Sequence, residues 1–190
     1  MLKNQLRIIG GKWRGRKLDF PNIEGLRPTP NRVRETLFNW LAPDIHNADC
    51  LDLFAGSGAL GFEALSRGAN KVIFIDSSKQ IIDQLKNNCQ LLNCDAAEIH
   101  QMDSEEYLKQ THKTFAIVFL DPPFKQNLIL KYCKLLTENN LLKPNAYIYI
   151  ETELQLKQTD FPDNLQILKQ KKAGKVNYLL IKFFNSLLTT

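Results

Sequence analysis

Apolar and polar positions alternate between two spacings along most of the chain. Short apolar runs, typical of strands that are buried in a sheet, occur over Cys50–Phe54, Lys71–Ile75, Ala97–Met102, Phe115–Leu120 and Ala146–Glu151. Segments with helical spacing lie between or after them, over Ala59–Arg67, Ser78–Leu92, Ser104–Gln110 and Leu128–Glu138. This order predicts a mostly parallel, doubly wound α/β sheet. Ligands of such sheets bind at the carboxyl ends of the strands, so the residues that follow each strand are the candidates for a site.

The first 44 residues do not follow this alternation and are expected to form an appendage. Leu6–Ile9 and Arg16–Phe20 flank two glycines, which predicts a short hairpin with a basic turn. Pro21–Pro30 contains three prolines and a glycine and is expected to be an extended connector. Asn31 is expected to cap a helix that ends near Leu41, with an apolar face formed by Val33, Leu37, Trp40 and Leu41.

The end of the chain predicts an antiparallel pair of strands. Leu165–Leu168 and Val176–Phe184 flank Ala173-Gly174, which is typical of a hairpin that closes a sheet. We therefore expect one α/β domain over residues 45–190, with residues 1–44 as its appendage.

Charge is unevenly distributed along the chain. Residues 1–34 hold nine Lys or Arg against Asp19 and Glu24, a net of +7, which leaves −2 for the rest of a chain whose total is +5. A basic segment of this kind fits a polyanion such as RNA. The predicted RNA contacts are Lys12, Trp13, Arg14, Arg16, Lys17, Arg27, Arg32 and Arg34. The basic turn is expected to extend past the catalytic face and to supply most of the RNA affinity. The alternative is that the arm is a structural flap over the cofactor, held down by Arg27 and Arg34.

Other features of composition exclude several classes of protein. No apolar run approaches the roughly 18–20 residues that span a bilayer, so a cytoplasmic protein is expected. Cys50, Cys89, Cys94 and Cys133 form no CxxC pair and lie at no metal-ligand spacing from a histidine. We expect reduced thiols in or near the core and no metal site.

A glycine-rich loop follows the first strand of the sheet. Gly56, Gly58 and Gly61 form GxGxxG between a predicted strand and a predicted helix. Gly56 would permit a tight turn, Gly58 would let a ligand approach the backbone, and Gly61 would let the helix pack closely on the strand. A bulky residue at Gly58 is expected to block the ligand and to leave the core undisturbed. Asp76 ends the second strand, 20 residues after Gly56, where its carboxylate can accept hydrogen bonds from ribose hydroxyls.

Two ligand classes fit this loop, a dinucleotide and S-adenosylmethionine. Asp52 favours the second, because a carboxylate repels a pyrophosphate but suits the ammonium group of a methionine moiety. Asp103 follows the third strand and could accept from an adenine amine, cap the next helix, or do both. The expected cofactor contacts are Asp52, Phe54, Ala55, Gly56, Ser57, Gly58, Gly61, Asp76, Ser77, Asp103 and Ser104.

The fourth strand runs into the tetrapeptide Asp121-Pro122-Pro123-Phe124. Two prolines stiffen this loop and leave its carbonyls free, which suits an acceptor site for an N–H group. Asp121 and the Pro122 carbonyl would accept both protons of an exocyclic base amine and turn its lone pair toward the methyl donor. Phe124 would stack on the base after it is flipped out of its helix. The alternative is a plain Pro-Pro turn with a core phenylalanine.

On these residues the chain resembles the RsmD-type family of bacterial 16S rRNA guanine-N2 methyltransferases. The resemblance covers nearly the whole chain and is most specific in the two N-terminal stretches, 7–18 and 26–41. It includes the glycine loop, the segment from Glu63 to Ala69, and Asp121–Phe124. It implies a Rossmann-like class I fold with a seven-stranded sheet, S-adenosylmethionine as the methyl donor, and guanine N2 of 16S rRNA in the small subunit as the acceptor. A monomer is expected.

Three other functions remain open on the sequence. An N6-adenine methyltransferase acting on DNA or RNA shares the cofactor loop and the tetrapeptide. A non-catalytic RNA-binding assembly factor with a relict cofactor pocket is the second. A nucleotide-binding dehydrogenase is the weakest, since a chain of 190 residues has no room for a substrate domain.

Overall fold

The computed structural model describes residues 4–122 and 128–184. In chain order the elements are β1 (Asn4–Arg7), the 3-10 turn η1 (Gly11–Trp13), β2 (Lys17–Phe20), α1 (Asn31–Trp40), β3 (Asp49–Asp52), α2 (Ala59–Ser66), β4 (Lys71–Asp76), α3 (Lys79–Leu92), β5 (Ala97–Gln101), α4 (Ser104–Gln110), β6 (Phe115–Leu120), α5 (Ile129–Glu138), β7 (Leu142–Thr152), the 3-10 turn η2 (Gln158–Asp160), β8 (Leu165–Ala173) and β9 (Val176–Phe183). The predicted alternation of strands and helices is confirmed.

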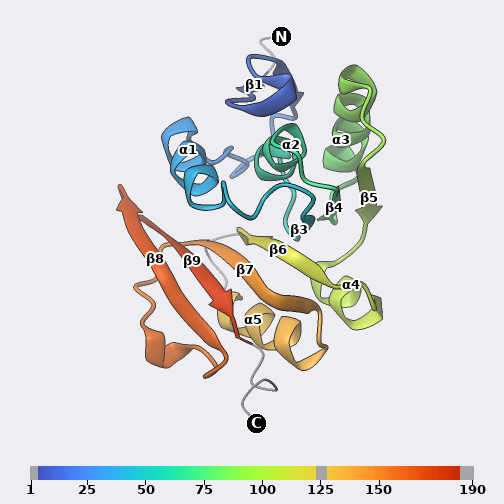
Figure 1. The fold of residues 1–190 in the computed structure, drawn as a ribbon. Coiled ribbons are helices and arrows are strands. Elements are labelled where there is room, and N and C mark those ends of the chain that lie inside the picture. The colour runs from blue at the N-terminus through green and yellow to red at the C-terminus, as the bar shows by residue number, and fades with distance from the viewer. Residues whose placement is uncertain (1–3, 123–127, 185–190) are drawn as a thin grey trace.

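A seven-stranded sheet in the order β5-β4-β3-β6-β7-β9-β8 forms the centre of the molecule (Figure 1). The strands from β3 to β7 pair in parallel, whereas β9 is antiparallel to both of its neighbours. The strand order reverses at β3, so the carboxyl ends of β3 and β6 flank the switch point where such sheets bind ligands. The predicted fold class is therefore confirmed.

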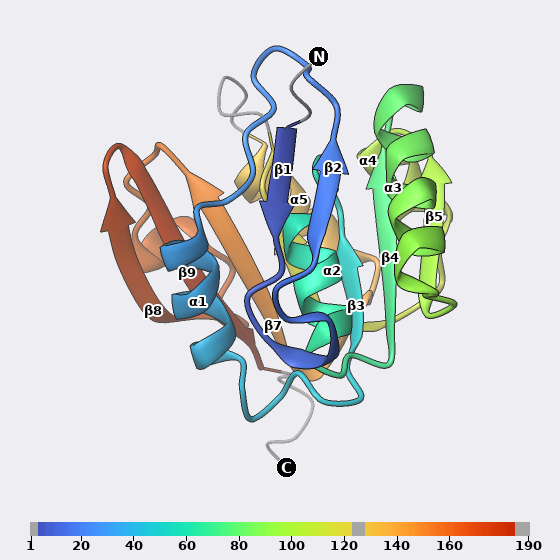
Figure 2. The same cartoon turned by 90° about the horizontal axis from the view of Figure 1, so that it is seen from above.

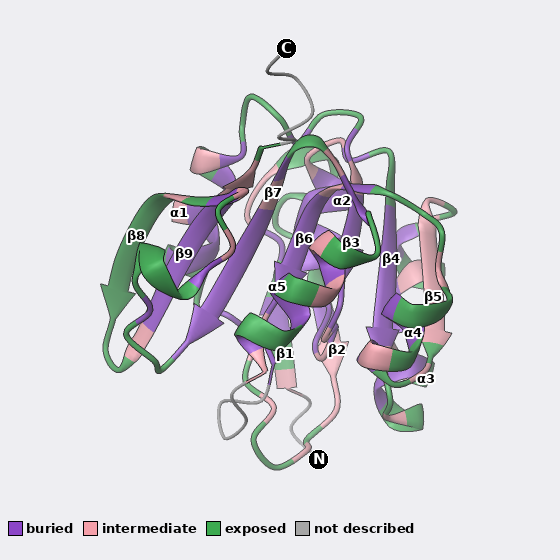
Figure 3. Cartoon of the chain, turned by 90° about the horizontal axis from the view of Figure 1, so that it is seen from below, coloured by how far each residue is buried: buried purple, intermediate pink, exposed green. Residues whose placement is uncertain are grey.

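Two apolar cores lie on the two faces of this sheet. One joins the sheet to α1, α2 and α3 and also takes in Leu6, Ile8 and Leu18 of the N-terminal hairpin. The other joins the opposite face to α4 and α5. Figure 3 shows the central strands as buried ribbons, with exposed residues on the outer helices and along β8. Within the described residues no helix is long and apolar enough to cross a membrane.

Several boundaries differ from those that the pattern predicts. β8 continues to Ala173 and not to Leu168, because it pairs with β9 along its whole length despite its polar sequence. β7 begins at Leu142, before a register shift opposite β6. Asn31 is not the cap of α1: Pro30 holds that position, and the Asn31 Oδ1 atom instead accepts a hydrogen bond from Arg34. The four cysteines are free, and Cys50 and Cys133 are buried.

Candidate active site

The loop between β3 and α2 is held in place by Asp76 at the end of β4. The Asp76 carboxylate accepts hydrogen bonds from the Gly56 N–H at 3.0 Å and from the Ser78 N–H at 2.9 Å. The Gly56 φ of 49° lies in the left-handed region that favours glycine, as a tight turn at this position requires. The structure thus brings Asp76 and the loop together, as the spacing predicts. Its proposed ribose contact would use the same carboxylate.

Gly61 and Asp52 join α2 to the sheet. A Cβ atom at Gly61 would overlap the Phe74 ring of β4, so close packing of helix and strand requires glycine here. The Gly61 N–H donates to the Asp52 Oδ2 atom at 3.0 Å, and Asp52 is buried at the carboxyl end of β3. Burial raises the pKa of Asp52 to about 8, and the neighbouring Asp76 and Glu151 carboxylates add to the shift.

Gly58 lies against the protein's own core, and the ligand approach that the sequence suggests at this glycine stays a prediction. Its φ is 75°, and a Cβ atom there would lie 2.7 Å from the side chains of Leu85 and Phe62. The neighbouring atoms that exclude a side chain therefore belong to the protein's own core. The expectation that a bulky substitution at Gly58 would leave the core undisturbed is wrong.

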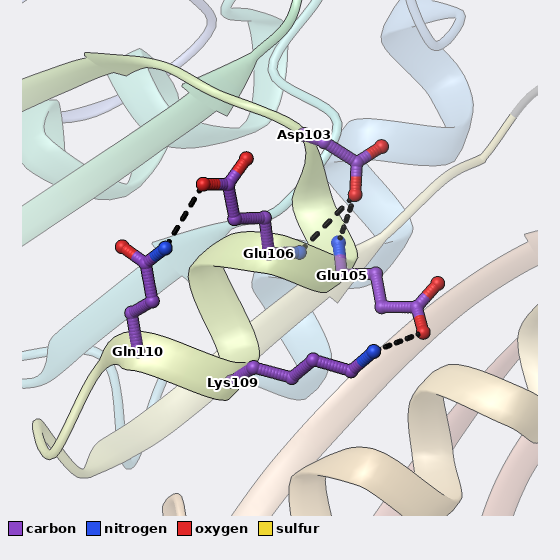
Figure 4. A pocket seen from close by; sticks show the side chains of 5 residues that line it. All are labelled: Asp103, Glu105, Glu106, Lys109 and Gln110. Carbon is purple, nitrogen blue, oxygen red and sulfur yellow. Dashed lines mark hydrogen bonds and ion pairs between the residues drawn. The ribbon is translucent and has the colours of Figure 1, made fainter.

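Asp103 caps α4, which confirms one of its two expected roles. Its Oδ1 atom accepts from the Glu105 N–H at 2.9 Å and from the Glu106 N–H at 3.1 Å, as Figure 4 shows. A hollow of about 370 Å³ lies here, lined by Asp103, Glu105, Glu106, Lys109 and Gln110. All of its lining residues belong to the start and outer side of α4, so it is separate from the glycine loop.

The remaining cofactor candidates are distributed around the same edge of the sheet. Ser104 is buried and its hydroxyl donates to the Leu53 carbonyl at 2.7 Å, so its side chain has no further proton to donate to a ligand. Phe54 packs edge-on against Tyr132 of α5, with ring centroids 5.2 Å apart. Ala55 and Ser57 are buried, and Ser77 follows Asp76 at the start of the turn into α3.

Asp121 follows β6 directly and lies within an acidic group. Burial raises its pKa well above the ordinary value, and the nearby Glu151 and Asp52 carboxylates raise it further. Pro122 is buried, while Pro123 and Phe124 lie outside the described residues. Within the described part of the chain, no Lys, Arg or His forms an ion pair with any of these three carboxylates.

Glu151 at the carboxyl end of β7 was not among the residues that the sequence predicts for the site. It is buried, and its Oε1 atom accepts from the Thr29 hydroxyl at 2.7 Å and from the Tyr149 hydroxyl at 2.9 Å. Burial raises its pKa. Leu26 of the same connector lies against the glycine loop, since a Cβ atom at Gly56 would lie 3.0 Å from its Cδ1 atom. The connector therefore crosses the carboxyl edge of the sheet, over the loop and beside the acidic group.

The N-terminal hairpin is docked on α2 through Glu63. This fully buried carboxylate accepts from the Ile9 and Gly10 N–H groups, each at 2.8 Å, and pairs with Arg67 at 2.7 Å and Arg34 at 3.4 Å. Arg34 is only 1% exposed. The prediction that Arg34 contacts RNA is therefore wrong, because its guanidinium is held in the core between the hairpin, α1 and α2.

The basic turn lies at the opposite edge of the sheet from the acidic group. The Trp13 N–H donates to Ser66 at the end of α2, and Arg16 donates to the Leu91 carbonyl near the end of α3. Both helices run antiparallel to the strands, so their ends lie beside the strands' amino ends. Figure 2 shows the β1–β2 turn and the connector at opposite ends of α2.

The expectation that this turn extends past the catalytic face is consequently wrong. Trp13 is partly buried against the core, with the Lys12 Nζ atom 4.3 Å from its ring centroid. Arg14, Arg16 and Lys17 are exposed, and their contact with RNA stays a prediction. Arg27 and Arg32 are also exposed, and they flank the connector residues beside Glu151, nearer to the site.

The group at the carboxyl edge has the chemistry that a methionine-derived cofactor needs. Asp52 is a buried carboxylate that can receive an ammonium group, and it lies beside a loop of left-handed glycines. Asp76 ends β4, and Asp103 follows β5 as the cap of α4, so both carboxylates lie after neighbouring strands of the sheet. Together with the strand order, this arrangement defines a Rossmann-like, S-adenosylmethionine-dependent methyltransferase.

Comparisons with known proteins agree with this class of enzyme. The model of the family described as Conserved hypothetical protein 95 matches residues 6–182, so the chain belongs to this family, the RsmD type that its sequence resembles. It is 54% identical over 182 residues to Ribosomal RNA small subunit methyltransferase D of Haemophilus influenzae, covering 94% of each chain. The protein of the same name from Escherichia coli is 47% identical over 176 residues, covering 93% of this chain and 89% of the relative. The solved structure of yhhF from Escherichia coli superposes with a TM-score of 0.87 at 45% identity, covering 95% of this chain and 99% of that one.

Proposed function

We propose that this chain transfers a methyl group from S-adenosylmethionine to the exocyclic N2 amine of a guanine in small-subunit ribosomal RNA. The observation that carries the proposal is the position of Asp121-Pro122, directly after the buried strand β6 and beside the acidic edge that holds the glycine loop. The two relatives named for methylation of small-subunit ribosomal RNA, at 54% and 47% identity, support the class of substrate. Action in the cytoplasm as a monomer is part of the proposal.

The chain's own residues orient the amine. When bound, S-adenosylmethionine supplies an electrophilic methyl group. The lone pair of an exocyclic amine is delocalised into the ring, so the amine is a weak nucleophile. Asp121 and the Pro122 carbonyl would accept its two protons and turn the lone pair out of the ring plane. The methylated nitrogen is strongly acidic, and an aspartate with a raised pKa is a better acceptor for its proton than an ordinary one.

The glycine-loop side of the site would bind the cofactor. Asp52 would receive its ammonium group, Asp76 its ribose hydroxyls, and Asp103 its adenine amine. The carboxylates of Asp76 and Asp103 each already accept hydrogen bonds from two backbone N–H groups. Only their remaining lone pairs would therefore bind the cofactor.

The two rival functions make different predictions. An N6-adenine methyltransferase would use the same cofactor loop and Asp121, and it would label adenine. A non-catalytic assembly factor would bind RNA without transferring a methyl group.

A transfer assay separates these possibilities. We would incubate the protein with cofactor carrying a labelled methyl group and, in parallel, unmethylated small subunits, naked small-subunit RNA and double-stranded DNA. The proposal predicts label in RNA only, and label in DNA or in none of the three would contradict it. Asp121→Ala should lower the rate by about 10²–10³ while leaving cofactor affinity nearly unchanged, because it removes an oriented acceptor but no part of the glycine loop. Asp95→Ala, on an exposed residue after α3, is the matched control.

A further inference from the structure

The hairpin formed by β8 and β9 ends beside the proposed active site. β9 runs antiparallel to β7, and Thr152 at the carboxyl end of β7 pairs with Asn177 at the start of β9. The tip of the hairpin, where Ala173 pairs with Val176, therefore lies at the carboxyl edge of the sheet. Figure 2 shows the tip at the same end of the molecule as the carboxyl end of β7. The hairpin thus borders the edge that holds Asp121 and Glu151.

This end of the hairpin carries a run of unpaired positive charge. All eight residues from Leu168 to Lys175 are exposed, and they include no acid. Four of them are lysines: Lys169, Lys171, Lys172 and Lys175. Within the described residues none of these lysines forms an ion pair, although the Lys171 Nζ atom lies 5.9 Å from the Trp40 ring centroid.

The lysines reach both faces of the sheet's outer strand. Lys169 and Lys171 pair with Leu180 and Tyr178, whose side chains belong to the core on the α1 face. Lys172 pairs with Asn177 and projects to the other face. The first three residues of β8, from Leu165 to Ile167, include no charged residue. Charge is therefore concentrated at the end of the strand that borders the site.

An RNA substrate needs positive charge at this place. Asp52, Asp121 and Glu151 at the carboxyl edge of the sheet form no ion pair with a cation in the described residues, so they cannot hold the phosphates on either side of a target nucleotide. Arg27 and Arg32 lie on the connector side of this edge. The lysine end of the hairpin lies along the same edge, beyond β7, where a strand of nucleic acid that leaves the site would pass.

We propose that the end of the β8–β9 hairpin, from Leu168 to Lys175, binds the phosphate backbone of the RNA next to the methylated nucleotide. The inference rests on the proposed function, since it assigns a surface to the same substrate. Lysines are also common on exposed edge strands, where they prevent edge-to-edge pairing. That role requires charge of either sign, whereas phosphate binding requires positive charge.

The test compares two variants of the hairpin with a control. The first replaces Lys169, Lys172 and Lys175 with Ala, and the second replaces the same residues with Glu; Lys171 is left in place because it packs on Trp40. The control replaces Lys86, Lys134 and Lys157 with Ala, which removes the same charge from exposed positions on α3, α5 and the β7–β8 connection. Binding to naked small-subunit RNA is measured by fluorescence anisotropy across a salt series, alongside steady-state methylation.

The hairpin-to-Ala variant should flatten the slope of log affinity against log salt by about two units, because each lysine bound to a phosphate of single-stranded RNA contributes about 0.7 to that slope. Its KM for RNA should rise about tenfold with kcat nearly unchanged, because the lysines do not touch the reacting atoms. The Glu variant should bind more weakly still while remaining soluble, and the control should keep the wild-type slope.

The inference would be overturned if both hairpin variants kept the wild-type salt slope and the wild-type KM for RNA. It would also be overturned if the control lost as much RNA affinity as the hairpin variants. Aggregation of the Ala variant with normal RNA binding by the soluble Glu variant would assign the lysines to edge protection and also overturn it. Absence of methyl transfer by the wild-type protein would instead contradict the proposed function.

Discussion

The hydroxyl of Thr29 donates a hydrogen bond of 2.7 Å to the buried Glu151 carboxylate, across 122 positions of the chain. This contact fastens the connector to the carboxyl end of β7. The connector also carries Leu26, which lies against Gly56 of the glycine loop. The Thr29 hydrogen bond and the Leu26 contact therefore link the connector to both halves of the proposed active site.

Thr29→Val should weaken this link. Removing the hydroxyl leaves one lone pair of a buried acid without its partner, which costs about 1–3 kcal/mol of unfolding free energy. The looser connector should also lower cofactor affinity. Urea denaturation and calorimetry measure the two effects. Thr36→Val is the matched control, since the Thr36 hydroxyl bonds only the Arg32 carbonyl of its own helix in an exposed position. Equal losses in the two variants would show that the Thr29 contact has no special role.

Glu63→Gln should have a larger effect on stability. Glu63 is fully buried and neutralises Arg34 and Arg67, so its loss leaves the buried Arg34 guanidinium without a counter-charge. Breaking a buried ion pair in this way costs about 3–5 kcal/mol. Glu106→Gln, at an exposed position of α4, is the control. A denaturation midpoint within error of wild type in Glu63→Gln would contradict the assignment of Glu63 as the group that holds the hairpin.

Gly58→Ala tests the contact of the loop's second glycine with the core. Both Gly58 and Gly15 have a left-handed backbone, with φ of 75° and 85°, so alanine is strained at either position. Only at Gly58 would the added Cβ meet other atoms, Leu85 and Phe62 at 2.7 Å, whereas nothing lies within 4 Å at Gly15. Gly58→Ala should therefore lower the free energy of unfolding by about 1–3 kcal/mol more than Gly15→Ala does. Equal losses in chemical denaturation would show that strain alone, and no clash with the core, makes glycine necessary at Gly58.

Asp52 predicts a pH dependence of cofactor binding. The pKa of Asp52 is raised from 3.8 to about 8, so the folded protein favours the neutral form of this side chain. The resulting contribution to folding stability is fully present below pH 3.8 and is lost as the pH rises through about 8. An ammonium group bound at Asp52 favours the carboxylate. Cofactor binding at pH 7 should therefore release a proton from Asp52.

Calorimetry of S-adenosylhomocysteine binding at pH 7, in buffers that differ in ionisation enthalpy, measures this release. Asp52→Asn is the reference, because the ligand's own titration is common to both proteins. Wild type should release about one proton more than the variant. The same proton count in both would remove Asp52 from the ammonium site.

Local features of the fold were predictable from the sequence, because the period of apolar residues and the chemistry of turns act over short distances. The glycines at 56 and 61 and the nearby Asp76 are examples, since strand, loop and helix follow one another directly. The capping role of Asp103 was likewise visible in its position before α4.

Contacts between distant segments were not predictable in this way. The link from Thr29 to Glu151 joins two segments whose separate patterns say nothing of each other. Arg34 was predicted to face RNA because it belongs to the basic N-terminal segment, and its burial follows from Glu63, 29 positions away. Glu63 did give a signal, as the one charged residue of the otherwise apolar helix α2. The length of β8 was missed because an edge strand need not bury its side chains, so its lysines resemble those of a loop.

The identity of the methylated nucleoside tests the central claim most directly. Small-subunit RNA labelled by the wild-type protein would be digested to nucleosides and separated by chromatography with mass detection. The account predicts that the label elutes as N2-methylguanosine and that Asp121→Ala forms this product about 10²–10³ times more slowly while the variant still binds cofactor. Label in N6-methyladenosine, or N2-methylguanosine formed at the wild-type rate by Asp121→Ala, would contradict it.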